Sequence, residues 1–185
     1  MDFLQNNPFT GTTSKCGASA GTTTTLTTAN ITDFAIASKA YRRAAISNAA
    51  VPTTDAVTGA AFLPIPIGTA SVSNGQGGFT EGFGQGCTFV VGLNAALAIR
   101  VVQGPVVRTT PGAVATSVFQ AVAGQPSFGM IPDNFSPICY ILVKTDSTTG
   151  AAWTFGTSNL AGPPAGTTIT FTDLIGGMPD RPQAT

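Results

Sequence analysis

The glycine-rich stretch SNGQGGFTEGFGQG, residues 73–86, is the part of the sequence that comes nearest to a chemical site. Glycine-rich loops can cradle phosphate groups, but a P-loop needs a lysine followed by serine or threonine after its last glycine. Here Gly86 is followed by Cys87 and Thr88, and the stretch contains no lysine. A dinucleotide fingerprint needs a third glycine at a fixed spacing before a helix, and that spacing falls on Cys87 or Thr80. The stretch is therefore predicted to be an extended hairpin tip between two strands.

The residue types also give little indication of a nucleophilic catalytic site or a metal site. The sequence contains no histidine, so an imidazole cannot activate a serine or cysteine, and the common zinc patterns are absent. Two Ser–Lys pairs remain, Ser14/Lys15 and Ser38/Lys39, but neighbouring side chains of an extended chain point to opposite faces. We predict no catalytic residue, no cofactor and no metal ligand, and we do not expect an enzyme. A hydrolase that works with carboxylates alone stays open as a competing hypothesis.

The cysteines point to a reduced interior. Cys16, Cys87 and Cys139 make an odd number without C-x-x-C spacing, so we interpret them as buried thiols rather than as a disulfide framework. The N-terminus has neither the basic start nor the apolar run of a signal peptide. No window reaches the roughly 18 apolar residues of a membrane helix, and we expect a soluble protein without an export signal.

Composition favours a single, mainly β domain that assembles with other proteins. Only 9% of the 185 residues are charged, against about 25% in typical soluble domains. Eight basic and eight acidic residues are scattered along the chain, so the basic stripe that nucleic-acid binding requires is missing. A net charge near zero removes one defence against self-association, which a protein made for assembly can tolerate.

Three segments organise the chain. Residues 1–30 are small and polar, so we expect an extended N-terminal arm with few apolar anchors. Residues 31–176 are predicted to form the β-rich domain, and residues 177–185 a loose tail. The fold class is an antiparallel β-sandwich or barrel-like domain with one short helix between Pro111 and Gly124.

Within the domain, a hairpin that turns near Ser38 and Lys39 is favoured over an amphipathic helix, although Ile36, Ala40 and Ala44 repeat at helical spacing. The segment 51–68 is predicted to be a connector or an edge, because Pro64 and Pro66 each remove a ladder donor. Further strands are expected at 69–72, 87–93, 99–102, 138–144, around Trp153 and Phe155, and at 167–174.

The aromatic residues divide into two groups. Trp153, Phe155 and Phe171 could form a ligand platform, but in a domain with few large residues they are expected to fill the core. Phe79 and Phe83 stand among glycines without a local core, so we predict that a neighbouring subunit or another partner covers them.

Several segments resemble small virion structural proteins that are encoded beside the capsid genes of tailed bacteriophages. They are LTTANITDFAIASKAYRRAA, VPTTDAVTGAAFLPIPIGTASV, TFVVGLNAALAIRVVQGPVV and IPDNFSPICYILVKTDSTTGAAWTFGTSNL. In SPICYILV, Cys139 stands where such chains often carry glycine, and residues 73–86 interrupt the pattern. The resemblance is structural and transfers no functional residues.

What the resemblance implies is a head decoration, or cement, protein that is made in the host cytoplasm and located on the capsid surface. It would bind the major capsid protein from outside and bridge neighbouring capsomers, as a homo-oligomer, most simply a dimer or trimer. Nucleic acid and membrane are not expected as partners. An attachment or fibre-type protein that binds a host receptor or glycan is the alternative. The predicted partner contacts are Leu4, Phe9, Leu26, Phe79 and Phe83.

Overall fold

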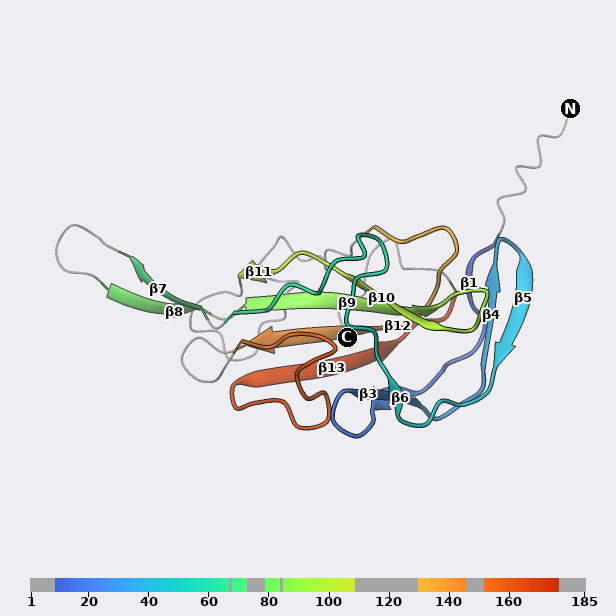
Figure 1. Cartoon of the computed structure of the whole chain (residues 1–185), viewed down its shortest axis with the longest axis horizontal. Coiled ribbons are helices and arrows are strands. Elements are labelled where there is room, and N and C mark those ends of the chain that lie inside the picture. The colour runs from blue at the N-terminus through green and yellow to red at the C-terminus, as the bar shows by residue number, and fades with distance from the viewer. Residues whose placement is uncertain are drawn as a thin grey trace, which may run out of the picture.

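The computed structural model describes residues 9–66, 68–72, 79–83, 85–108, 130–145 and 152–176. Over these ranges the regular elements are all strands, and every strand pairing is antiparallel (Figure 1). The fold is therefore mainly β, as the sequence predicts. The predicted helix between Pro111 and Gly124 and the predicted tail lie outside the described residues.

The strands fall into four sheets. One sheet has the order β1–β4–β5, a second β10–β9–β12–β13 with β11 paired to β9, a third β2–β3–β6, and the last is the pair β7–β8. In chain order the strands are β1 (Gly11–Thr12), β2 (Ala18–Ala20), β3 (Thr25–Thr28), β4 (Thr32–Ile36), β5 (Lys39–Arg43), β6 (Ala49–Ala50), β7 (Gly68–Val72), β8 (Phe79–Phe83), β9 (Gln85–Leu93), β10 (Ile99–Gln103), β11 (Val107–Arg108), β12 (Ser136–Thr145) and β13 (Thr167–Asp173).

Two long apolar strands form the centre of the largest sheet. β9 is buried at every position after its first residue, and β12 is buried at all positions except Tyr140 and Lys144. Because successive side chains of a strand point to opposite faces, both faces of this strand pair need a cover. The rest of the chain supplies it.

An aromatic cluster fills one face of the central sheet. Phe89 of β9 stacks on Phe155 with 4.7 Å between ring centroids, and Trp153 meets Phe89 edge-on at 5.8 Å. Phe62 packs against Phe155 at 5.2 Å. All four rings are buried, as expected for the core, and Phe171 of β13 packs against the same core.

The strand expected around Trp153 and Phe155 is not formed. Trp153 makes a single bridge with Ile65 through two backbone hydrogen bonds of 2.8 and 3.0 Å, and Phe155 lies in the turn that follows. Trp153 and Phe155 alternate along the sequence as they would in a strand, but both rings enter the core from a short loop. Pro64 and Pro66 flank the bridge in the predicted connector, where only Ile65 has to pair.

The described part of the predicted N-terminal arm belongs to the folded body. Residues 11–28 form β1, β2 and β3, which pair with β4 and β6. Leu26 is completely buried in the aromatic core, together with Phe34 of β4. The sequence argument weighed the few apolar side chains of this segment, whereas backbone pairing with later strands is what orders it.

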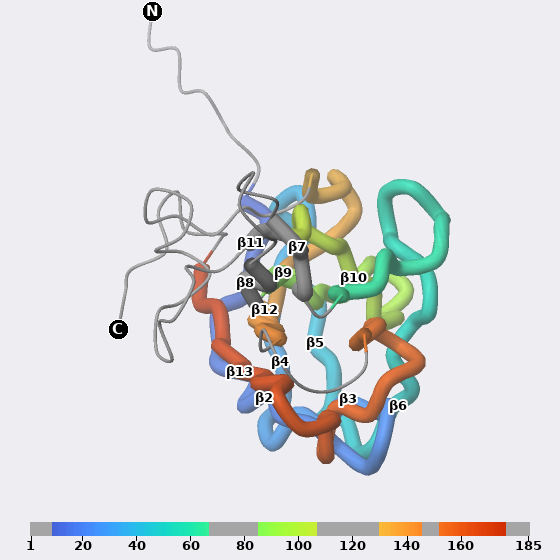
Figure 2. The backbone as a smooth tube through the Cα atoms, turned by 90° about the vertical axis from the view of Figure 1, so that its left-hand side faces the viewer, coloured from blue at the N-terminus to red at the C-terminus, as the bar shows by residue number. Residues whose placement is uncertain are grey.

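Asp173, the last residue of β13, fastens the N-terminal segment to the central sheet. Its carboxylate accepts hydrogen bonds from the backbone N–H groups of Gly17 and Ala18, each at 3.0 Å, and from the Cys16 thiol at 3.0 Å. Just beyond, Thr12 and Gly176 exchange backbone hydrogen bonds of 2.9 and 2.6 Å. The two ends of the described chain therefore close the fold side by side, as the view along the sheet shows (Figure 2).

We expect Phe89→Ala to lower the free energy of unfolding by about 3–5 kcal/mol, because it removes the ring that contacts three other buried aromatics. Denaturant unfolding followed by tryptophan fluorescence measures this, since Trp153 is the only tryptophan. Thr168→Ala on the exposed side of β13 is the control. Equal loss in both variants would contradict the assignment of the core.

We expect Asp173→Ala to lower the free energy of unfolding by about 1–3 kcal/mol, because two backbone donors lose a charged acceptor. Amide hydrogen exchange should accelerate at Gly17 and Ala18 before the central strands respond. Asp173→Asn keeps one acceptor oxygen and should lose less. Unchanged exchange in the alanine variant would show that this carboxylate does not hold the N-terminal strands.

Candidate partner-binding surface

The β4–β5 hairpin carries the open edge of a three-stranded sheet at one end of the molecule (Figure 1). Its turn residues, Ala37 and Ser38, have positive φ values of 48° and 65°, the conformation of the two-residue hairpin turn that matches strand twist. The hairpin predicted from the sequence is thus confirmed, and the competing helix is excluded. β5 is the outer strand, so no described strand pairs with its second edge.

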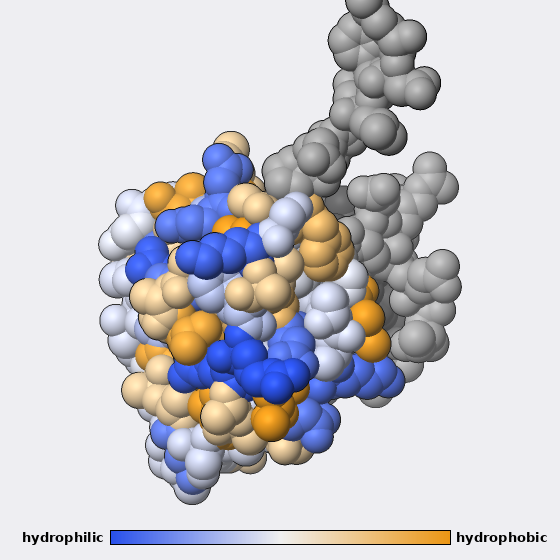
Figure 3. All heavy atoms as spheres, turned by 90° about the vertical axis from the view of Figure 1, so that its right-hand side faces the viewer, coloured by the Kyte–Doolittle hydropathy of each residue, from blue (hydrophilic) through white to orange (hydrophobic). Residues whose placement is uncertain are grey.

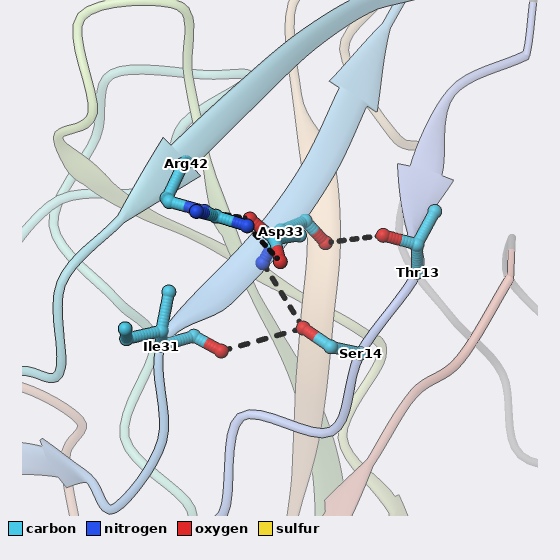
Figure 4. Close-up of polar contacts among 5 residues, drawn as sticks. All are labelled: Thr13, Ser14, Ile31, Asp33 and Arg42. Atoms are coloured by element: carbon cyan, nitrogen blue, oxygen red, sulfur yellow. Dashed lines mark hydrogen bonds and ion pairs between the residues drawn. The ribbon is translucent and has the colours of Figure 1, made fainter.

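Polar contacts hold this hairpin against β1 and the loop that follows β1 (Figure 4). Arg42 donates to both carboxylate oxygens of Asp33 across the hairpin, at 2.6 and 3.2 Å. Ser14 accepts from the backbone N–H of Asp33 at 3.0 Å and donates to the Ile31 carbonyl at 3.3 Å. Thr13 donates to the Asp33 carbonyl. The hydrogen bond from Arg42 lowers the pKa of Asp33, so the pair stays ionised at neutral pH.

Alternate residues of β5 present a basic and aromatic row on the core side of the hairpin. Tyr41 stacks on Phe34 with ring centroids 5.3 Å apart. Lys39 places its Nζ 5.5 Å from the centroid of the Tyr41 ring, within the range of a cation–π contact. Arg43 follows two residues later on the same face. In the view onto this end of the molecule, hydrophilic residues gather in the middle of the surface with hydrophobic residues around them (Figure 3).

Arg43 has a buried nitrogen without a hydrogen-bond partner. Its Nη1 atom is inaccessible to solvent and unpaired, and so is Oγ1 of Thr32, the residue directly opposite Arg43 in the ladder. Burial lowers the pKa of Arg43, and no acidic side chain offsets the burial. Most buried polar groups in proteins have a partner, so this corner of the hairpin is a candidate for a contact with another molecule.

A pocket of about 470 Å³ lies beside the hairpin turn. Ala37 of the turn and Thr10 form one side, and Asp133 is its one charged lining residue. Phe9 and Met130, next in sequence to lining residues, are 44% and 79% exposed. The remaining lining residues are Ile131, Pro132, Phe135 and Pro137. This mostly apolar hollow could hold an apolar side chain.

Ser14 and Ser38, which were weighed as nucleophiles, and the carboxylate of Asp55 have structural partners. Ser14 is hydrogen-bonded in the hairpin support, and Ser38 accepts from the backbone N–H of Phe9 at 3.0 Å. Asp55 accepts from the backbone N–H groups of Gln103, Val57 and others at 2.7–2.9 Å, which ties its loop to β10. In the described ranges, no three His, Cys, Asp or Glu side chains are grouped to hold a metal.

The three cysteines are buried and form no disulfide bond, as predicted. Burial raises the pKa of Cys87 to about 12. The pKa of Cys139 is raised by a hydrogen bond with Cys16, by burial and by the Asp173 carboxylate. Cys87 and Cys139 therefore remain thiols at neutral pH, which disfavours nucleophilic chemistry.

The residues predicted as partner contacts fall in different surroundings. Phe9 is exposed beside the pocket, whereas Leu26 is buried within its own chain and has no surface for a partner. Phe79 and Phe83 are the two ends of β8. Leu4 lies outside the described residues. The sequence analysis missed the Lys39–Tyr41–Arg43 row, although the predicted hairpin and the alternation KAYRR would have indicated it.

Fold and surface together define a mainly β protein. Among the described residues, its candidate contact features are the open edge of β5 and the pocket beside the hairpin turn. None of the described segments forms a helix long and apolar enough to cross a membrane. Comparisons with protein-family models, with curated proteins and with solved structures found no match.

Acid should weaken the fold partly through Asp55. Burial alone raises the pKa of this carboxyl, but the backbone donors and the Thr58 hydroxyl outweigh it, so the pKa is lowered. The folded pKa lies below the unfolded value of about 3.9. The stabilisation is therefore complete above that value and is lost as pH falls through the folded pKa.

We expect Asp55→Asn to be less stable than the wild type at neutral pH, with a gap that narrows from about pH 5 downward. Urea unfolding across this range measures it. Asp33, whose pKa is also lowered, is present in both proteins and cancels in the difference. A gap that is independent of pH would contradict the assigned role of the Asp55 charge.

Proposed function

We propose that this protein is a structural component of a bacteriophage particle that binds the outside of the capsid and bridges neighbouring capsomers. The observation that carries the proposal is the placement of two open strand surfaces at opposite ends of one elongated molecule (Figure 1). At one end lies the edge of β5, and at the other the β7–β8 ribbon extends away from the central sheet. A molecule with a contact surface at each end can join two neighbours.

The low stability expected of an isolated β7–β8 ribbon supports the bridging role. Within the part of the chain that the structure describes, Gly68–Val72 and Phe79–Phe83 pair with each other and with no further strand, from Gly68 opposite Phe83 to Val72 opposite Phe79. A two-stranded ribbon is marginally stable in water by itself. Packing against a capsid or a neighbouring copy would supply the missing burial.

The described chemistry fits this role. Asp33, Asp55 and Asp173 are each engaged within the fold, and Cys87 and Cys139 are buried thiols. Low charge and a neutral balance suit a protein that covers a surface rather than one that remains dispersed. The expected capsid partner is the major capsid protein.

The projecting ribbon also favours a second function, attachment to a host receptor or glycan. The two functions differ in where the protein sits. Copies distributed over the whole shell in cryo-electron microscopy of intact particles would support the capsid role, whereas copies confined to a vertex or tail would support attachment.

Particles that lack this protein should release their genome at a lower temperature than complete particles, because the bridges between capsomers are missing. Differential scanning fluorimetry with a nucleic-acid dye measures genome release, and adding back the purified protein should restore the higher temperature. Equal release temperatures with and without the protein would refute the capsid role.

The double variant Phe79→Ser/Phe83→Ser should bind particles at least about tenfold more weakly, since two aromatic contacts are lost. Thr80→Ser, on the same strand, is the matched control. Both variants should unfold at nearly the same temperature as the wild type, because β8 is outside the central sheet. Undiminished particle binding by the double variant would remove the ribbon from the interface.

A further inference from the structure

The open edge of β5 carries an excess of positive charge, which favours a negatively charged partner strand. Lys39, Arg42 and Arg43 give the hairpin three cations, and Asp33 neutralises only Arg42. Arg43 is half-buried and its Nη1 atom is inaccessible in the single chain, so an added strand would reach only the exposed part of this side chain. A carboxylate on such a strand would offset the excess of positive charge at this edge.

The backbone of β5 is set up to receive such a strand. In a hairpin with a two-residue turn, the closing pair Ile36–Lys39 exchanges hydrogen bonds, and every second pair after it does the same. The backbone N–H and C=O groups of Ala40 and Arg42 therefore point to the open edge. These are the groups that pair when a strand is added to a sheet.

The chain itself contains a matching strand. β8 has five residues, as β5 does, and among the described residues it pairs with β7 alone, so no described strand occupies its other edge. Its central residue, Glu81, is the only glutamate in the sequence, and Phe79 and Phe83 occupy the alternate positions on either side. On β5 the alternate positions hold Lys39, Tyr41 and Arg43, which is a cation, an aromatic ring and a second cation.

We propose that β8 of one copy pairs antiparallel with the open edge of β5 of a second copy, with Glu81 opposite Arg43. The same register places Phe83 opposite Tyr41, so an aromatic pair accompanies the ion pair. The carboxylate offsets the positive charge of Arg43, and each edge gains backbone hydrogen bonds.

The charges select this pairing over the pairing of two β5 edges. An antiparallel β5–β5 contact centred on Tyr41 would place Lys39 opposite Arg43, and like charges directly opposite destabilise a strand pair. Because β5 and the ribbon lie at opposite ends of the molecule (Figure 1), the proposed contact is head-to-tail. Head-to-tail contacts close into rings or continue as open chains, and a ring of three would also meet the expectation of a trimer.

The test uses two full-length charge-reversal variants, Arg43→Glu and Glu81→Arg. Each variant alone should self-associate at least about tenfold more weakly than the wild type, because it places like charges opposite each other. An equimolar mixture should recover association, since the β5 edge of the first variant then meets the ribbon of the second. Multi-angle light scattering over a concentration series at low salt measures the mass.

A third variant tests the strand edge without changing a charge. Ala40→Pro removes the outward N–H group next to the paired residues 41–43 and leaves the bonds to β4 in place, so it should weaken association. Ala40→Ser keeps the N–H group and is the control. Melting temperatures of all variants separate loss of association from loss of the fold.

A wild type that remains monomeric over the series would overturn the inference, and the lysine on β5 would then only protect the edge from pairing. Single variants that associate like the wild type, or a mixture that fails to recover, would overturn it as well. The inference concerns contacts between copies in solution and uses the same β5 edge and β7–β8 ribbon as the proposed function, but the two are measured separately, by self-association and by particle binding. A monomer that still binds particles would leave the proposed function intact.

Discussion

Burial of β9 and β12 on both faces is the constraint on which the rest of the structure depends. Their side chains are apolar at successive positions, so a cover on one face alone would leave a row of Val, Ile and Leu in water. The aromatic cluster around Phe89 covers one face together with the N-terminal strands. Val90, Val102 and Phe135 pack on the other face with Ala56 and Ile131. β2 to β5 and the described loops that carry Phe62 and Trp153 contribute side chains to that cover.

Covering strands made mostly of threonine, alanine and glycine bury little apolar area, so polar contacts fix their positions. Asp173 binds the backbone of Gly17 and Ala18, and Asp55 binds that of Gln103. Hydrogen bonds to a charged acceptor contribute more than neutral ones. The described carboxylates with such partners are thus used to assemble the fold, which leaves strand edges as the places where another molecule can add to it.

The open edges of β5 and β8 arise because both strands lie at the margins of small sheets outside the central sheet. β5 and β8 stand at the margins of small sheets that cover or extend from the centre, and neither is needed to close the central sheet. Natural β proteins usually protect such edges. Here the edge strand β5 carries Lys39, Tyr41 and Arg43 in a row, and this row is the basis of the proposed pairing between copies.

The β class, the buried thiols, the β4–β5 hairpin and the strong strands at 87–93 and 138–144 can all be predicted from the sequence, because they depend on local alternation, turn chemistry and apolar runs. The order of residues 11–28 cannot, since it comes from pairing with other strands and from Asp173, more than 140 residues away. Long-range packing also places Leu26 in the core and Trp153 and Phe155 in a loop. The buried Nη1 atom of Arg43, which has no hydrogen-bond partner, could not be predicted from the sequence, because hydrogen-bond partners depend on which residues the fold brings close.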